Sequence, residues 1–150
     1  MQLIDPKNYA QTVNWILNTA VTVKNVNFAA QGNIYELNTM EITKYPLVWV
    51  SAVQPVTETE FYWVYNLTLY YFDRVKEECE DINDSDSIDS QSNGIIALSA
   101  LVNIIRNAEW CYDLGWDNNY TLFASTPVFS DMCTGVYTQI SIKVAKETVC

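Results

Sequence analysis

The stretch that decides the fold is Phe61-Tyr-Trp-Val-Tyr-Asn-Leu-Thr-Leu-Tyr-Tyr-Phe-Asp-Arg74, in which half of the residues are aromatic. It contains neither glycine nor proline and is rich in the residue types that favour strands, so it predicts one long β-strand. At roughly 3.3 Å per residue the strand runs about 46 Å. A compact chain of 150 residues has a diameter of about 40 Å, so we expect the strand to cross the whole domain.

Both faces of this strand carry apolar side chains, and both therefore need cover. One face holds Phe61, Trp63, Tyr65, Leu67, Leu69 and Tyr71, and the other holds Tyr62, Val64, Asn66, Thr68, Tyr70 and Phe72. Because a single small core covers one face more easily than two, we expect a subunit that packs against other subunits. The expected interface residues are Phe61, Trp63, Tyr65, Tyr70 and Phe72. The alternative is a central strand covered by helices on one side and loops on the other.

Composition indicates one folded domain spanning residues 1–150, with 49% apolar and 17% charged residues. Histidine, the usual general base near neutral pH, is absent. We therefore expect a protein that is not an enzyme and has no catalytic residues. An enzyme that uses only carboxylates and tyrosines is the weakest reading.

The first residues predict no signal peptide, and no apolar run is long enough to span a membrane. We therefore expect synthesis in a cytoplasm. The four cysteines, Cys79, Cys111, Cys133 and Cys150, form no C-x-x-C pair. They predict reduced thiols rather than a zinc site or disulfides.

Acidic residues gather between Asp73 and Asp89, in a chain whose formal net charge is -10. Residues 76–93 predict a solvated loop, in which the acids are Glu77, Glu78, Glu80, Asp81, Asp84, Asp86 and Asp89. This charge argues against tight binding of nucleic acid. The oxygen donors resemble the spacing of an EF-hand calcium loop, but Asp86 replaces the turn glycine and Ser92 replaces the closing glutamate. We therefore expect no bound metal or other cofactor.

The remaining pattern predicts an α+β domain, with a mostly antiparallel sheet and two helices packed on one face. The expected helices cover residues 8–28 and about 94–107, the second preceded by the cap candidates Asp89, Ser90 and Ser92. Strands are expected at residues 34–42, 47–53, 61–74, 120–125 and 136–144, and the second should pair antiparallel with the third. Trp110, Tyr112 and Trp116 form an aromatic cluster after the second helix. This cluster is expected at a core edge or an interface, and alternatively forms the pocket of a small ligand- or peptide-binding module.

Three segments in a fixed order resemble a known family. They are Lys44-Tyr-Pro-Leu-Val-Trp-Val50, Leu69-Tyr-Tyr-Phe-Asp-Arg-Val75 and Phe129-Ser-Asp-Met-Cys-Thr-Gly-Val-Tyr-Thr-Gln-Ile-Ser-Ile-Lys-Val144, with Ser92-Asn-Gly-Ile-Ile-Ala-Leu98 between the last two. Together they resemble the small tail-terminator, tail-completion and neck-ring proteins of tailed bacteriophages, especially phages of Bacteroidetes, including the crAss-like group.

This resemblance implies a virion structural protein, assembled in the host bacterial cytoplasm, that forms a homo-oligomeric ring with a tail-terminator-like fold. The ring would connect portal and head to tail, or close the end of a tail tube, in contact with other neck, portal or tail proteins. Genomic DNA would pass through its lumen without specific binding, and no membrane would be involved. The candidates to face this channel are the loop acids Glu77, Glu78, Asp81, Asp84, Asp86 and Asp89. A strand that is apolar on both faces suits such a subunit, because head-to-tail interfaces can close into rings.

Overall fold

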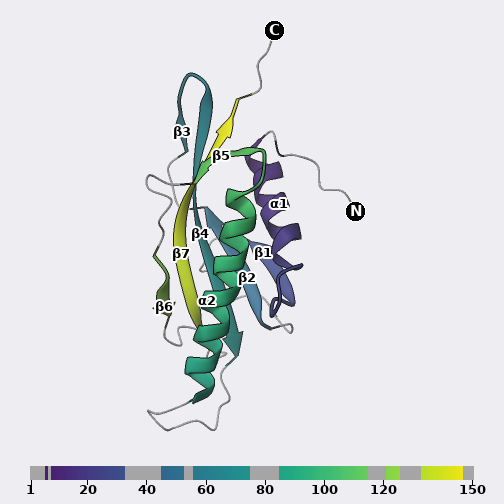
Figure 1. Cartoon of the computed structure of the whole chain (residues 1–150), viewed down its shortest axis with the longest axis vertical. Coiled ribbons are helices and arrows are strands. Elements are labelled where there is room, and N and C mark those ends of the chain that lie inside the picture. Colours follow the sequence, from purple (N-terminus) through teal and green to yellow (C-terminus); the bar gives the residue numbers. More distant parts are fainter. Residues whose placement is uncertain are drawn as a thin grey trace.

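The structure, a computed structural model, describes residue 6 and residues 8–32, 45–52, 56–74, 85–114, 121–125 and 133–146. Two helices lie on the same side of one sheet (Figure 1). The helices are α1 (Tyr9–Ala20) and α2 (Ser85–Arg106). The strands are β1 (Phe28–Gln31), β2 (Leu47–Ala52), β3 (Thr57–Glu58), β4 (Tyr62–Arg74), β5 (Cys111–Leu114), β6 (Phe123–Ser125) and β7 (Cys133–Ala145).

The sheet has the order β1-β2-β4-β7-β5, with β3 paired to β4 and β6 paired to β7. Only the β1–β2 pairing among those described is parallel. The predicted α+β class with a mostly antiparallel sheet and helices on one face is therefore confirmed.

The long aromatic strand forms the centre of the sheet, as predicted. As β4 it pairs with β7 along its whole length, from Tyr62 opposite Ala145 to Arg74 opposite Cys133. On its other edge it pairs antiparallel with β2, also as predicted, from Leu47 opposite Phe72 to Ala52 opposite Leu67. Side chains alternate between the faces of a strand, so this register gives each face of β4 matched neighbours on β2 and β7.

One face of the sheet packs against both helices and forms the main core. From β4 it takes the odd-numbered residues of the strand, in agreement with the predicted alternation. The buried members include Val13 and Ile16 of α1, Leu98, Leu101 and Ile105 of α2, Val48 and Val50 of β2, Tyr65, Leu67, Leu69 and Tyr71 of β4, and Val136, Ile140, Ile142 and Val144 of β7.

Helix α1 is shorter than the sequence predicts. Its N-cap is Asn8, whose side chain accepts a hydrogen bond from the Gln11 N–H at 2.9 Å. The helix ends at Ala20, although Val23 continues the apolar stripe and is buried. The chain turns there instead, with Asn25 in the left-handed region at φ 71°. The predicted helix over residues 8–28 is therefore wrong in its last two turns, because the stripe is continued by a buried turn.

Helix α2 begins earlier than predicted. The loop expected over residues 76–93 is helical from Ser85 onward, and residues 76–84 lie outside the described part of the chain. Ser90 is buried and donates a hydrogen bond to Asp73 at 3.3 Å, and Gly94 is also buried. Ser90 and Gly94, the first buried positions of α2 that the structure describes, are small, so this part of the helix lacks the apolar stripe that would have predicted it.

The structure has three short strands that the sequence did not predict. Of the predicted strands, one is shorter than expected and one lies outside the described residues. β1, β3 and β5 were not expected. The strand expected at 120–125 is shorter, as β6. The strand expected at 34–42 lies outside the described residues. Phe28-Ala-Ala-Gln31 has little strand signal of its own, so β1 depends on its pairing with β2.

Candidate interaction site

The β3–β4 hairpin projects from one end of the sheet, past the ends of both helices (Figure 1). Its two strands pair Thr57 with Val64 and Glu58 with Trp63. Residues 56–62, which we call the hairpin tip, form the turn and the strand ends beside it. The tip stands away from the main core, so its side chains can be reached without disturbing the fold.

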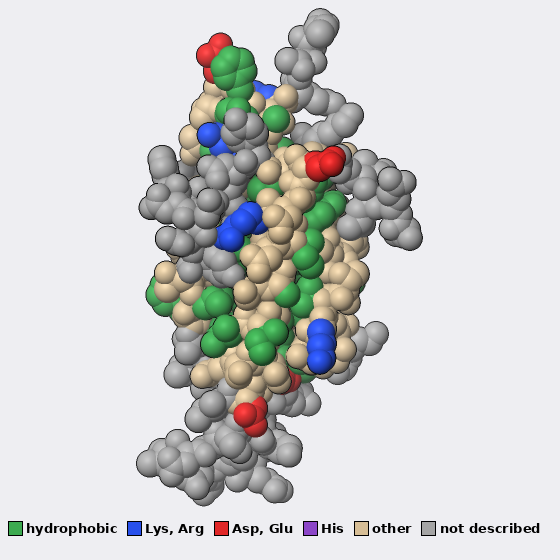
Figure 2. Space-filling view, viewed as in Figure 1, with side chains coloured by type: hydrophobic (Ala, Val, Ile, Leu, Met, Phe, Trp, Pro, Cys, Tyr) green, Lys and Arg blue, Asp and Glu red, His purple; other side chains and the backbone are tan. Residues whose placement is uncertain are grey.

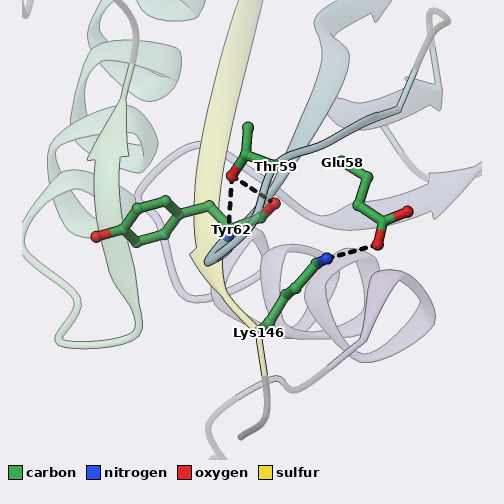
Figure 3. Close-up of polar contacts among 4 residues, drawn as sticks. All are labelled: Glu58, Thr59, Tyr62 and Lys146. Atoms are coloured by element: carbon green, nitrogen blue, oxygen red, sulfur yellow. Dashed lines mark hydrogen bonds and ion pairs between the residues drawn. The ribbon is translucent and has the colours of Figure 1, made fainter.

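Thr59 fixes the shape of the hairpin tip. Its backbone N–H donates to the Tyr62 carbonyl at 2.9 Å. Its hydroxyl accepts a hydrogen bond from the Tyr62 N–H at 3.0 Å and donates one to the Tyr62 carbonyl at 3.1 Å (Figure 3). The turn is also tied to the end of β7, because the Lys146 N–H donates to the Phe61 carbonyl at 2.8 Å. A turn held at both ends in this way loses little conformational entropy when it binds.

Phe61 lies inside this turn, between two hydrogen-bonded residues, and its side chain is 63% exposed. It was predicted to be part of the strand, but β4 begins one residue later. Val56, on the other arm of the hairpin tip, is 50% exposed. The Phe61 ring lies edge-on to the Tyr62 ring, with 6.4 Å between the ring centroids. A large apolar side chain at a tightly held turn is well suited to enter a hydrophobic site on another molecule.

Charged side chains surround the hairpin tip on both faces. Lys146 pairs with Glu58 at 2.5 Å (Figure 3). Its ammonium also lies 4.9 Å from the centre of the Trp63 ring. Lys143 lies 4.5 Å above the Tyr62 ring on the opposite face. Because Glu58 is 60% exposed, its ion pair contributes little to stability. These contacts were not predicted, since residues 58 and 146 are far apart in the sequence.

The other predicted interface residues are placed differently from Phe61. Tyr65 is 3% exposed and Phe72 is 1% exposed, so both are covered within this chain. Tyr65 packs edge-on against Tyr9, at 5.1 Å between ring centroids, and burial raises the pKa of both phenols. Trp63 and Tyr70 are half-buried. Of the five predicted interface residues, Phe61 is therefore the one whose side chain is mostly exposed.

The sheet face opposite the helices carries a row of aromatic rings across four strands. The register places Trp49 beside Tyr70, Tyr70 beside Tyr137, and Tyr137 beside Phe123. Tyr137 stacks on Phe123 at 5.2 Å and lies 5.6 Å from Tyr70. Trp49 belongs to a second small core with Leu47 and Phe72. The predicted need for cover on both faces is therefore met in part by this chain itself.

The predicted aromatic cluster is described only in part. Trp110 packs edge-on against Trp15 of α1, with ring centroids 4.9 Å apart, and is half-buried. Tyr112 lies in β5, and Trp116 lies outside the described residues. Trp110 therefore serves the core edge, one of the places expected for the cluster. Cys111, beside Trp110, is buried and forms no disulfide within the described part of the chain.

The candidate acidic residues fall mostly outside the described part of the chain. Glu77, Glu78, Asp81 and Asp84 are among those not described, and Asp86 lies in the first turn of α2. Asp89 is exposed on α2. Within the described residues no group of three or more acidic or cysteine side chains is placed to hold a metal ion. No helix in that part of the chain is both long and apolar enough to cross a membrane.

Comparison with known proteins adds no assignment. No protein-family model matches the chain. No curated protein matches it either. The function is therefore argued from the hairpin tip and the surfaces around it.

Proposed function

We propose that this chain is a structural subunit that assembles with copies of itself into a ring. The ring is of the kind that joins head and tail in the neck of a tailed phage, or closes the tail end, and lines the channel for DNA. The observation that carries the proposal is the projecting hairpin tip, which holds Phe61 exposed in a fixed turn. The segment resemblance described above supplies the biological setting.

A rigid aromatic anchor is the feature that protein interfaces use most efficiently. Interface energy concentrates in a few aromatic or arginine side chains that enter pockets on the partner. Phe61 has this character because Thr59 and Lys146 hold its backbone on both sides. Phe61 directly precedes β4, and β4 is paired with β7 along its full length. The anchor is therefore attached to the centre of the sheet.

The charge of the chain also fits a DNA channel. With a formal net charge of -10, copies arranged around a lumen would repel phosphate and keep DNA from adhering as it passes. Asp89, exposed on α2, belongs to the acidic group that we assign to the lumen. The repulsion weakens as salt screens it.

Electron microscopy of the purified chain tests this proposal. At high protein concentration, alone or with its neck partners, the wild-type chain should form annular particles. Phe61→Ser should abolish them, whereas Val21→Ser, which alters a side chain 47% exposed at the end of α1, should not. Particles of single-chain size under every condition would refute the ring.

A further inference from the structure

A second surface on the molecule is as unusual as the hairpin tip. Between Asp89 and Arg106, helix α2 contains no charged residue. Its exposed positions in this stretch, which we call the outer face of α2, are Ser92, Asn93, Ile95, Ile96, Asn103 and Ile104. Figure 2 shows this part of the helix in tan and green, without red or blue.

Solvated helix faces normally carry charged side chains, and this chain has eighteen acids available. Ile96 is nevertheless 61% exposed, Ile95 46% and Ile104 40%. Together with Phe61 and Val56 of the hairpin tip, they make up most of the large apolar side chains that are exposed among the described residues. Two exposed apolar surfaces, one projecting and one lying along a helix, are what a head-to-tail contact requires.

We infer that the hairpin tip of one copy docks on the outer face of α2 of the next copy. This inference rests on the proposed ring and names its contact. Phe61 and Val56 would pack among Ile95, Ile96 and Ile104, burying apolar surface on both sides. Because the two surfaces are different patches of the same chain, the contact is heterologous, and repeating it with a suitable rotation closes a ring.

Electrostatics selects this pairing over contact between two tips. The hairpin tip carries the exposed carboxylates Glu58 and Glu60. Contact between two tips would bring these acids together, and like charges at an interface are unfavourable. From Ile95 to Ile104 the outer face of α2 has no carboxylate, and the cationic Arg106 lies at its C-terminal end. The exposed Asp89 lies on the same side of the helix, about two turns before Ile96. In a chain of net charge -10, the part of α2 around Ile96 and Ile104 is therefore a surface that an acidic tip can approach with little like-charge repulsion.

A mixing experiment tests the contact directly. One variant, Phe61→Ser, has an altered tip and an intact outer face. The other, Ile96→Glu, has an intact tip and an outer face that now repels it. Each variant alone should associate more weakly than wild type by about 30-fold or more, as for an interface hot spot. Mixed together, they should form a 1:1 pair of twice the 17.2 kDa chain mass and nothing larger, measured by sedimentation velocity.

Controls separate the contact from the fold. Circular dichroism and thermal unfolding should match wild type for each variant, because both positions are exposed. Ile104→Glu should reproduce Ile96→Glu, and Val21→Ser should associate like wild type. If Ile96→Glu and Ile104→Glu still form full rings, the docking inference is wrong while the ring stands. If wild type itself stays monomeric at millimolar concentration, alone and with its partners, both the ring and this contact are refuted.

Discussion

The ring of Tyr71 in β4 lies directly against Gly94 of α2, so closely that a Cβ added to Gly94 would stand 2.6 Å from Cδ1 of Tyr71. Tyr71 is fully buried, and its hydroxyl donates to the Asn25 carbonyl, with 3.5 Å between the oxygens. One side chain at the centre of the sheet thus contacts α2 and the turn that follows α1. The position of α2, and with it the outer face proposed to bind the hairpin tip, depends on this contact.

Gly94→Ala should destabilise the protein, although alanine favours helices by about 1 kcal/mol over glycine. The new methyl would also lie 2.8 Å from Cγ2 of Val136, and both neighbours are buried. Overpacking of this kind costs about 1–3 kcal/mol. We expect a net loss of about 1 kcal/mol in the free energy of unfolding, measured in urea. Asn93→Ala, at an exposed position of the same helix turn, is the matched control and should not destabilise. A stabilised Gly94→Ala protein would contradict the close packing.

Tyr71→Phe should change how stability depends on pH. Burial, followed by the nearby Asp73 charge, raises the pKa of the Tyr71 phenol. Above the ordinary tyrosine pKa of about 10, the unfolded chain loses the phenol proton while the folded chain retains it, so stability falls with rising pH. Phenylalanine has no phenol proton, so the variant lacks this loss of stability at high pH. At neutral pH the variant should be less stable by about 0.5–1.5 kcal/mol through loss of the hydrogen bond to Asn25.

Urea unfolding of wild type and variant at about pH 9 and about pH 11 checks this expectation. The stability difference between the two proteins should shrink at the higher pH. Tyr9 and Tyr65, whose phenol pKa values burial also raises, remain in both proteins and cancel in the comparison. A difference that stays constant would show that the Tyr71 phenol titrates alike in both states.

Thr59→Val should loosen the hairpin tip without unfolding the domain. It removes the hydroxyl that accepts from the Tyr62 N–H and leaves the backbone bond of the turn in place. We expect faster hydrogen exchange at the Tyr62 amide and a change of less than about 1 kcal/mol in global stability. Thr57→Val, in the exposed strand β3, is the control and should leave that amide unchanged. Equal exchange in the Thr59 variant would mean that the hydroxyl does not hold the turn.

Much of the sheet could be predicted because its pattern is local. The alternation along β4 and β7 identifies two strands and correctly divides their side chains between the faces. The β2–β4 pairing followed from the short connection between them. The apolar stripe of α1 predicted a helix but not its end, since Val23 is buried in a turn rather than on the helix.

The candidate site depends on long-range contacts that no local pattern reveals. Lys146 reaches Glu58 and the Phe61 carbonyl only because β7 runs beside β4. Phe61 looked like one more strand residue because its sequence neighbours are aromatic, whereas its place in the turn comes from the Thr59–Tyr62 hydrogen bonds. The outer face of α2 was hidden for a related reason. Ser92 and Asn93 indicated a loop, although they lie on the exposed side of a helix.

Thiol titration tests the expectation that all four cysteines are reduced. Under denaturing, non-reducing conditions we expect four free thiols per chain. In the folded protein Cys111 should react slowly, because its side chain is buried in the main core, in strand β5 beside β7. Mass spectrometry after alkylation identifies which cysteine reacts and when. Denatured protein with no free thiol would reverse the expectation.

The proposed ring is tested most directly by native mass spectrometry of the wild-type chain at increasing concentration, alone and with the neck proteins proposed as its partners. A closed ring gives one discrete multiple of the 17.2 kDa chain mass and no larger species, because closure leaves no hairpin tip or outer face unoccupied. We expect that single multiple. A mass of 17.2 kDa at every concentration and in every mixture would contradict the account.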